Sequence, residues 1–290
     1  MKIFLESASF GGVNTLRQTP FFSGSIASSF LSPIPGINYD YFYLPHPSLK
    51  FSWVKKRQRV WIMMENPAVW MPSLEFLEWY GYIVSPFVLP AGNYTHIQTH
   101  PAIPWFYGVN FRTDRGLQHV PDNQSCRSYN LIKASHPHKK KLISMITSSK
   151  GMTVGHQWRF ALATKLKEIL KDKIDIFGFG HRPISNKCDA LDPYYYTVVV
   201  ENSSHYDYWT EKLSDAMLAR CMPIYFGAPN ISDYFNKVLF QADHLGDVEK
   251  AALNVVRLLE SSYNDVTLSS FKNSILNIHN LYSHLPSLLE

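Results

Sequence analysis

The fold is decided by residues 195–227, which read YYTVVVENSSHYDYWTEKLSDAMLARCMPIYFG. The first six residues, 195–200, are β-branched or aromatic and predict a buried strand. Thr210 is a suitable N-cap for a helix that we expect to reach Arg220, and a second strand is expected at 222–226. This order of strand, loop, helix and strand is typical of a parallel α/β sheet.

Segments on both sides continue this pattern in the C-terminal half. The expected elements are a strand at 141–146, a helix at 156–171, a strand at 174–178, a helix at 247–259 and a helical tail near Ser269. Ligands of such sheets bind outside the carboxyl ends of the strands, where loops meet helix N-termini. The loops expected to form a binding site are 147–155, 178–183 and 201–210.

The N-terminal half has shorter and less regular runs. A strand is expected at 60–64, a helix at 73–80 and a further strand at 82–84. The segment 85–128 is rich in proline and turn residues, so it predicts few elements. We predict an α/β fold of two domains that divide between residues 135 and 136.

The composition excludes several classes of protein. With 46% hydrophobic and 18% charged residues among 290, the chain can bury a full core and is not globally disordered. Its three cysteines include no CxxC pair, which argues against a zinc or redox motif. Its formal charge of +5 is too small to indicate nucleic acid. No apolar run reaches the roughly 18 residues of a membrane-spanning helix and no signal peptide is recognisable, so we expect a cytoplasmic protein.

The densest basic cluster is HPHKKK, at residues 136–141. One interpretation is a solvated loop between two domains. The other is a patch that attracts anions, in which Lys139, Lys140 and Lys141 contact the inner face of a membrane peripherally.

The polar residues after the strand 195–200 are the first candidates for a site. Lys212 lies in the first turn of the expected helix, where acids are usually preferred, so its position indicates a bound anion such as a diphosphate. Glu211 can accept hydrogen bonds from ribose hydroxyls. Glu201 and Asn202 can point into the crevice at the carboxyl ends of the strands, where such a ligand would bind. The alternative is an ordinary exposed helix start with mixed charges.

Arg159 and Glu65 are candidates at two other strand ends. Arg159 belongs to the first turn of the helix expected at 156–171, where a guanidinium can bind phosphate oxygens in bidentate fashion. Glu65 follows the strand at 60–64, and an inverting sugar transfer needs one carboxylate to remove the proton of the acceptor hydroxyl. The alternative for both is a solvated surface side chain.

Several segments together resemble one known family. VENS at 200–203, DYWTEK at 207–212 and MPIYFGAP at 222–229 are similar to the donor-binding signature of the α1,3-fucosyltransferases of glycosyltransferase family 10. Weaker similarity links MENP at 64–67 to the Glu-Ser-Pro segment of that family. The sequence departs from the family pattern at Trp209, where valine is usual.

The resemblance implies a GT-B fold, in which two Rossmann-like domains face a central cleft. Residues 1–135 would bind the acceptor, and residues 136–290, with their helical tail, would bind GDP-fucose. The implied reaction is an inverting transfer of L-fucose to a glycan hydroxyl, α1,3 to GlcNAc of a surface glycan or lipopolysaccharide. It requires no metal and no other cofactor.

The resemblance also implies roles for individual residues. Glu65 would be the catalytic base, and Arg159 and Lys212 would stabilise the departing diphosphate. The other donor-binding residues that it implies are Asn202, Tyr208, Glu211, Ser148, Ser149, Gly178 and Glu201. Two alternatives stay open: a family member with a different nucleotide-sugar donor or linkage, and a non-catalytic protein that binds nucleotide sugars or glycans.

Overall fold

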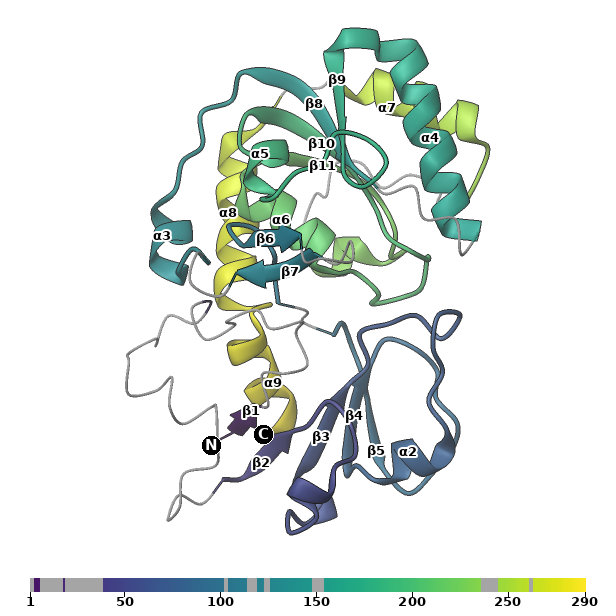
Figure 1. Cartoon of the computed structure of the whole chain (residues 1–290), viewed down its shortest axis with the longest axis vertical. Coiled ribbons are helices and arrows are strands. Elements are labelled where there is room, and N and C mark those ends of the chain that lie inside the picture. Colours follow the sequence, from purple (N-terminus) through teal and green to yellow (C-terminus); the bar gives the residue numbers. More distant parts are fainter. Residues whose placement is uncertain are drawn as a thin grey trace.

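The computed structural model of the chain describes residues 3–5, 18, 39–101, 104–113, 119–122, 126–147, 154–235, 245–260 and 263–290. It has two lobes, drawn one above the other in Figure 1, and each is built around a parallel sheet. The N-terminal lobe is the lower one in this view. The predicted fold class, α/β with two domains, is confirmed.

The C-terminal sheet has four parallel strands. They are β8 (Lys141–Ile146), β9 (Ile174–Phe177), β10 (Tyr194–Val200) and β11 (Met222–Phe226), all at predicted places. In space their order is β11-β10-β8-β9, so the chain leaves β8 towards one side and returns on the other side at β10. A sheet with this order binds ligands where the direction changes, outside the carboxyl ends of β8 and β10.

Helices cover both faces of this sheet, which is why its strands read as continuous apolar runs. They are α4 (Val154–Leu170), α5 (Cys188–Leu191), α6 (Glu211–Leu218), α7 (Val248–Leu258) and α8 (Asp265–Asn277). α4 packs beside α7, and α6 packs beside α8. Among the residues of β10, Tyr195 alone is exposed, so both faces of this strand are covered along most of its length.

The N-terminal sheet has five parallel strands that follow one another in chain order. They are β1 (Ile3–Leu5), β2 (Tyr41–Tyr43), β3 (Arg59–Ile62), β4 (Tyr82–Ser85) and β5 (Thr95–Gln98), with α2 (Leu74–Glu78) between β3 and β4 in the chain. The predicted strands at 60–64 and 82–84 and the predicted helix at 73–80 are confirmed. β1 and β2 were not predicted, because runs of three residues carry no readable period.

Alternate residues of the N-terminal sheet face two separate cores. Trp61 and Ile83 pack against the α2 side, whereas Val60 and Val84 face the opposite side. The second side is covered by α9 (Leu281–Leu289), which lies beside β1 and β2 in Figure 1. The predicted helical tail therefore runs from the C-terminal lobe back to the N-terminal one and completes its core.

The described residues between 104 and 135 contribute to the cores of both lobes. They include the antiparallel pair β6 (Asn110–Thr113) and β7 (His119–Asp122) and the helix α3 (Tyr129–Ala134). Trp105, Tyr107 and Ile132 belong to the core of the C-terminal lobe. These three residues thus pack with the C-terminal lobe, although they precede the predicted boundary between residues 135 and 136.

The basic cluster at 136–141 is not a uniform surface patch. Lys139 is buried, and its ammonium donates hydrogen bonds to the carbonyls of Leu191 (3.2 Å) and Ala219 (2.8 Å). The prediction that Lys139 faces a membrane is wrong, because its charge is used inside the lobe; Lys140 and Lys141 are exposed. Among the described residues, no helix is both long and apolar enough to cross a bilayer.

Candidate active site

A cavity of about 610 Å³ opens at the carboxyl ends of the C-terminal strands. Thr147 after β8, Gly178 after β9 and Val200 at the end of β10 contribute to its wall, together with Lys212 of α6. The three loops expected to form a binding site thus begin at this cavity. Four of the predicted site residues line it, namely Arg159, Gly178, Glu211 and Lys212.

Glu201 and Lys212 form a buried ion pair beneath this cavity. The Glu201 side chain is 0% exposed, and its Oε2 lies 3.0 Å from the Lys212 ammonium. The same carboxylate accepts hydrogen bonds from the backbone N–H (2.8 Å) and hydroxyl (2.7 Å) of Thr210. Glu201 was predicted to bind the donor. That role stays a prediction; the contacts in the structure fix the start of α6 and the direction of Lys212.

Lys212 remains charged in this setting. Burial favours the neutral amine and alone would lower its pKa, but the carboxylates of Glu201 and Glu211 outweigh burial and raise the pKa above its ordinary value. The Thr210 hydroxyl accepts a further hydrogen bond from the ammonium at 2.9 Å. The side chain keeps 25% of its surface exposed on the cavity side, which suits contact with an anionic ligand.

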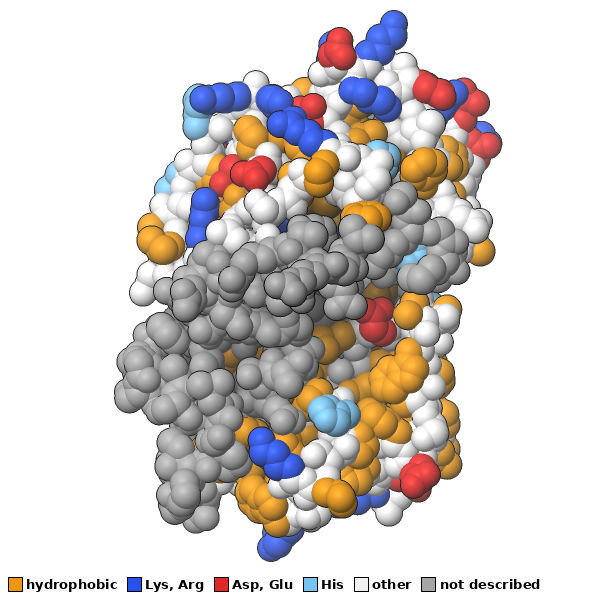
Figure 2. All heavy atoms as spheres, in the orientation of Figure 1, with side chains coloured by type: hydrophobic (Ala, Val, Ile, Leu, Met, Phe, Trp, Pro, Cys, Tyr) orange, Lys and Arg blue, Asp and Glu red, His pale blue; other side chains and the backbone are white. Residues whose placement is uncertain are grey.

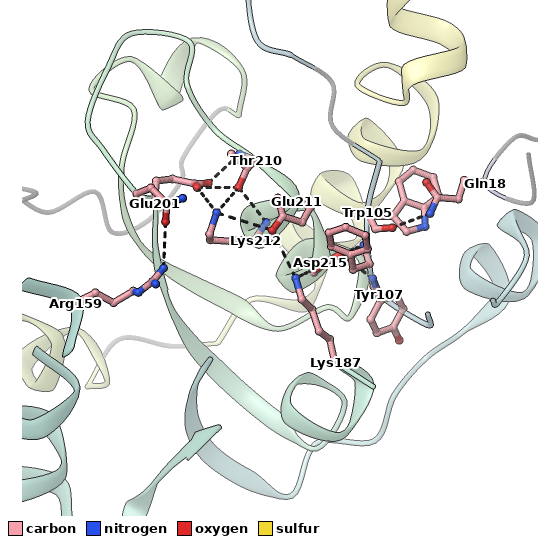
Figure 3. A network of polar contacts seen from close by, with 12 residues as sticks. Gln18, Trp105, Tyr107, Arg159, Lys187, Glu201, Thr210, Glu211, Lys212 and Asp215 are labelled. Atoms are coloured by element: carbon pink, nitrogen blue, oxygen red, sulfur yellow. Dashed lines mark hydrogen bonds and ion pairs between the residues drawn. The ribbon is translucent and has the colours of Figure 1, made fainter. Parts of the chain in front are cut away.

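Glu211 lies between two lysines. Its Oε1 is 3.8 Å from the ammonium of Lys212 and 3.8 Å from that of Lys187. Burial opposes the ionised form of this carboxyl, but the two lysines lower its pKa below the ordinary value. Figure 3 shows the row of charges that results, from Glu201 through Lys212 and Glu211 to Lys187 and Asp215.

Arg159 approaches the cavity from the other side. It lies in the second turn of α4, one turn later than predicted, and only 6% of it is exposed. Its guanidinium donates to Asn202 Oδ1 at 3.4 Å, while its buried Nε has no hydrogen-bond partner among the described residues. Burial lowers its pKa, and Glu201 and Glu211 counteract this effect. Asn202, which was predicted to bind the donor, thus contacts Arg159 but does not line the cavity.

Gly178 has a backbone conformation that excludes a side chain. Its φ is +114°, and a Cβ at this position would lie 1.9 Å from the carbonyl oxygen of Thr147. β8 and β9 can therefore end side by side at the cavity only with glycine here. Ser148 and Ser149, which were also predicted to bind the donor, lie outside the described residues.

Tyr208 and Glu65 connect this region to the N-terminal lobe. The Tyr208 ring is buried in the α2-side core and packs on Phe87 with centroids 5.0 Å apart. Burial raises its pKa, Lys212 lowers it, and the carboxylates of Glu201 and Glu65 raise it further. Glu65 is exposed three residues beyond the end of β3, so the structure places the predicted base on the opposite lobe from the lysines.

Two charged residues of the site were not predicted from the sequence. Lys187 and Asp215 line the cavity and pair at 2.5 Å. Asp215 follows Glu211 by one helical turn, a spacing that puts both carboxylates on the same face of α6, and this was the available signal. The described residues contain no group of three or more histidine, cysteine, aspartate or glutamate side chains placed to hold a metal ion.

Residues 136–252 match the model of the C-terminal domain of glycosyltransferase family 10 (fucosyltransferase). The C-terminal lobe therefore resembles this domain, and residues 1–135 lie outside the match. The match covers β8 to β11 and the row of charges around Lys212.

The chain is also similar to individual proteins. Alpha-(1,3)-fucosyltransferase FucT of Helicobacter pylori is 31% identical over 81 residues, which are 28% of this chain and 17% of that protein. A putative fucosyltransferase-like protein of Arabidopsis thaliana is 37% identical over 65 residues, 21% of this chain and 13% of that protein. The matched region thus spans less than a fifth of either relative. A crystal structure of an α1,3-fucosyltransferase with GDP-fucose is 16% identical, covers 97% of this chain and 92% of that chain, and has a TM-score of 0.47.

Proposed function

We propose that this chain is an inverting fucosyltransferase that moves L-fucose from GDP-fucose to a glycan hydroxyl. The observation that carries the proposal is the pair of cations at one cavity, Arg159 from α4 and Lys212 from α6, at the carboxyl ends of β8 and β10. The match of residues 136–252 to the model of a fucosyltransferase family supports the identity of the sugar.

The donor would lie with its diphosphate between Arg159 and Lys212. Arg159 offers a fork of N–H groups that is already buried and has an unused Nε donor, so little reorganisation is needed when a phosphate arrives. Lys212 adds a positive charge whose direction is fixed by Glu201. Glu211, in the same wall, would accept hydrogen bonds from the ribose hydroxyls.

The transfer would be a single displacement. Glu65 accepts the proton of the acceptor hydroxyl while the hydroxyl oxygen attacks the anomeric carbon of fucose from the face opposite GDP. The bond between that carbon and the diphosphate oxygen breaks, and its electron pair leaves with GDP. Arg159 and Lys212 stabilise the charge that develops on this oxygen, a task that other transferases assign to a metal ion. Inversion of a β-linked donor gives an α-linked product.

The acceptor would bind on the N-terminal lobe, where Glu65 lies. Figure 2 shows that hydrophobic side chains dominate the visible face of this lobe, whereas charged ones gather on the C-terminal lobe. Trp53 and Trp70 are among its exposed aromatic residues, and flat aromatic faces suit sugar rings. By analogy with the name of the Helicobacter pylori relative, we propose an α1,3 linkage. We further propose GlcNAc of a surface glycan or lipopolysaccharide as the acceptor and the cytoplasm, or the inner face of a membrane, as the place of the reaction, which would need no metal.

A transfer assay with Glu65→Gln tests the proposed reaction. Labelled GDP-fucose and a panel of GlcNAc-containing oligosaccharides are incubated with the wild type and the variant, and fucosylated product is measured. We expect kcat to fall by at least about a hundredfold while the Kd for GDP-fucose stays unchanged. Glu75→Gln, which changes an exposed carboxylate of α2, is the control and should retain full activity. Equal activity of Glu65→Gln and wild type would overturn the role of Glu65, and transfer of another sugar would overturn the choice of donor.

A further inference from the structure

Lys187 lies at the cavity wall but has no role in the function proposed above. Its ammonium is 2.5 Å from Asp215 Oδ2 and 3.8 Å from Glu211 Oε1, and its side chain is 18% exposed. Lys139, by contrast, donates to two backbone carbonyls and is held inside the lobe. The described hydrogen bond and ion pairs of the Lys187 ammonium go to carboxylates only, which an anionic ligand can replace.

Asp215 is held in place independently of Lys187. Its Oδ1 accepts the backbone N–H groups of Phe106 and Tyr107, both at 2.8 Å, and its side chain is 1% exposed. Two amide donors on one oxygen fix this carboxylate. Lys187 is attached to the site by a flexible four-carbon stem. Of the two partners, therefore, Lys187 is the one that can move.

The two lysines have equivalent positions relative to Glu211. Each ammonium lies 3.8 Å from the same oxygen, Oε1, which is beyond hydrogen-bonding distance. Glu211 Oε1 therefore lies near both ammoniums, those of Lys187 and Lys212, without a hydrogen bond to either. Among the charged side chains that line the cavity, three are cations and two are anions, so the wall itself has an excess of positive charge.

We infer that Lys187 is a third cation of the donor site. Its ammonium pairs with Asp215 in the free protein and binds a phosphate oxygen of the nucleoside diphosphate in the complex. This inference rests on the proposed function, since it needs a diphosphate in the cavity. On binding, the ammonium turns from Asp215 Oδ2 to the ligand, and Asp215 keeps its two backbone donors. In the free protein Asp215 is thus the anionic partner of Lys187 in place of the phosphate, and it competes with the ligand for this ammonium.

Calorimetry with GDP, GMP and guanosine tests this role in the full chain. For Lys187→Met we expect GDP to bind about tenfold or more weakly, because a charge-assisted hydrogen bond is lost, whereas guanosine binding changes less than about twofold. Lys187→Arg should recover part of the GDP affinity. Lys141→Met is the matched control: Lys141 also pairs with an aspartate, Asp175 at 2.8 Å, but outside this cavity, and its loss should leave GDP binding unchanged.

The Asp215→Asn variant tests whether Asp215 competes with the diphosphate for Lys187 or only holds Lys187 in a position that favours binding. The amide oxygen can still accept the N–H groups of Phe106 and Tyr107, but the negative charge is gone. If Asp215 competes with the diphosphate, this variant binds GDP more tightly than wild type. Weaker GDP binding in Asp215→Asn, wild-type GDP binding in Lys187→Met, or an equal loss for guanosine would each overturn the inference.

The two proposals fail in different ways. If the wild type binds GDP through Lys187 but transfers no fucose, the inference stands and the proposed function fails. If it transfers fucose and Lys187→Met binds GDP like wild type, the inference alone fails.

Discussion

The fully buried carboxylate of Glu201 holds the ammonium of Lys212 at 3.0 Å. The two residues come from the end of β10 and the first turn of α6, so the pair joins a strand to the helix that follows it. Thr210 connects them a second time, because its hydroxyl donates to Glu201 and accepts from Lys212. The direction of the cation is therefore built into the fold before any ligand binds.

Loss of the Glu201 charge should lower both stability and nucleotide affinity. In Glu201→Gln one partner of a buried ion pair is missing, and we expect the free energy of unfolding to fall by about 3 kcal/mol. Urea unfolding measures this change, and calorimetry with GDP measures the accompanying loss of affinity. Glu168→Gln removes an exposed carboxylate and should change stability by less than about 0.5 kcal/mol. Equal stability of Glu201→Gln and wild type would show that the pair does not hold α6.

The geometry of the Arg159 guanidinium should matter as well as its charge. Arg159→Lys keeps a cation but removes the planar fork and the Nε donor, so GDP should bind about tenfold more weakly. Calorimetry reports this difference. Arg257→Lys, at an arginine that donates to Asn254 on the surface, is the control and should bind GDP normally. An Arg159→Lys variant with full affinity would mean that only charge is needed at this position.

Three histidines make the chain sensitive to acid. His100 stacks on His284 with ring centroids 3.9 Å apart and on Trp209 at 4.4 Å, and His279 Nδ1 lies 3.1 Å from His100 Nε2. Burial lowers the pKa of His279 and of His284 to about 4, and the neighbouring His284 adds to this effect at His279. Both pKa values are below the ordinary 6.5, so the neutral rings favour the folded state.

The sign of the pH dependence follows from these values. The stability that the neutral rings contribute is complete above about pH 6.5 and is lost as the pH falls towards 4, where the unfolded chain binds more protons than the folded one. Urea unfolding between pH 4 and pH 8 should show this loss. It should be smaller in His284→Phe, which keeps a ring in the stack, and unchanged in His138→Asn, which alters an exposed histidine. A pH profile of His284→Phe identical to that of wild type would exclude the cluster as the cause.

The sheet of the C-terminal lobe and most of the helices around it could be predicted from the sequence, but α3 and α5 could not. Its strands are buried on both faces, so each one reads as a continuous apolar run, and α4 and α6 carry clear helical patterns. The N-terminal lobe was predicted less fully. β1 and β2 have three residues each, and α9 stabilises this lobe from the far end of the chain. A packing partner so distant in sequence leaves no local pattern.

The residues of the site, too, could be predicted only where a local sequence pattern marks them. Arg159, Glu211 and Lys212 could be predicted because they follow strands at the edge where ligands bind. The positions of Tyr208 and Asp215 could not, because each depends on distant contacts: the Tyr208 ring packs on Phe87, and Asp215 accepts N–H groups from residues more than 100 positions earlier. The complete burial of Glu201 could not be predicted either, because sequence alone does not separate a residue in the wall of a cavity from one beneath it.

Calorimetric titration with GDP-fucose, GDP-mannose and UDP-sugars, on wild type and Lys212→Ala, tests the central claim most directly. We predict that the wild type binds GDP-fucose in preference to the other donors and that the substitution abolishes this binding. Equal binding by Lys212→Ala, or no binding of any nucleotide sugar by the wild type, would contradict the claim that this cavity is a donor site.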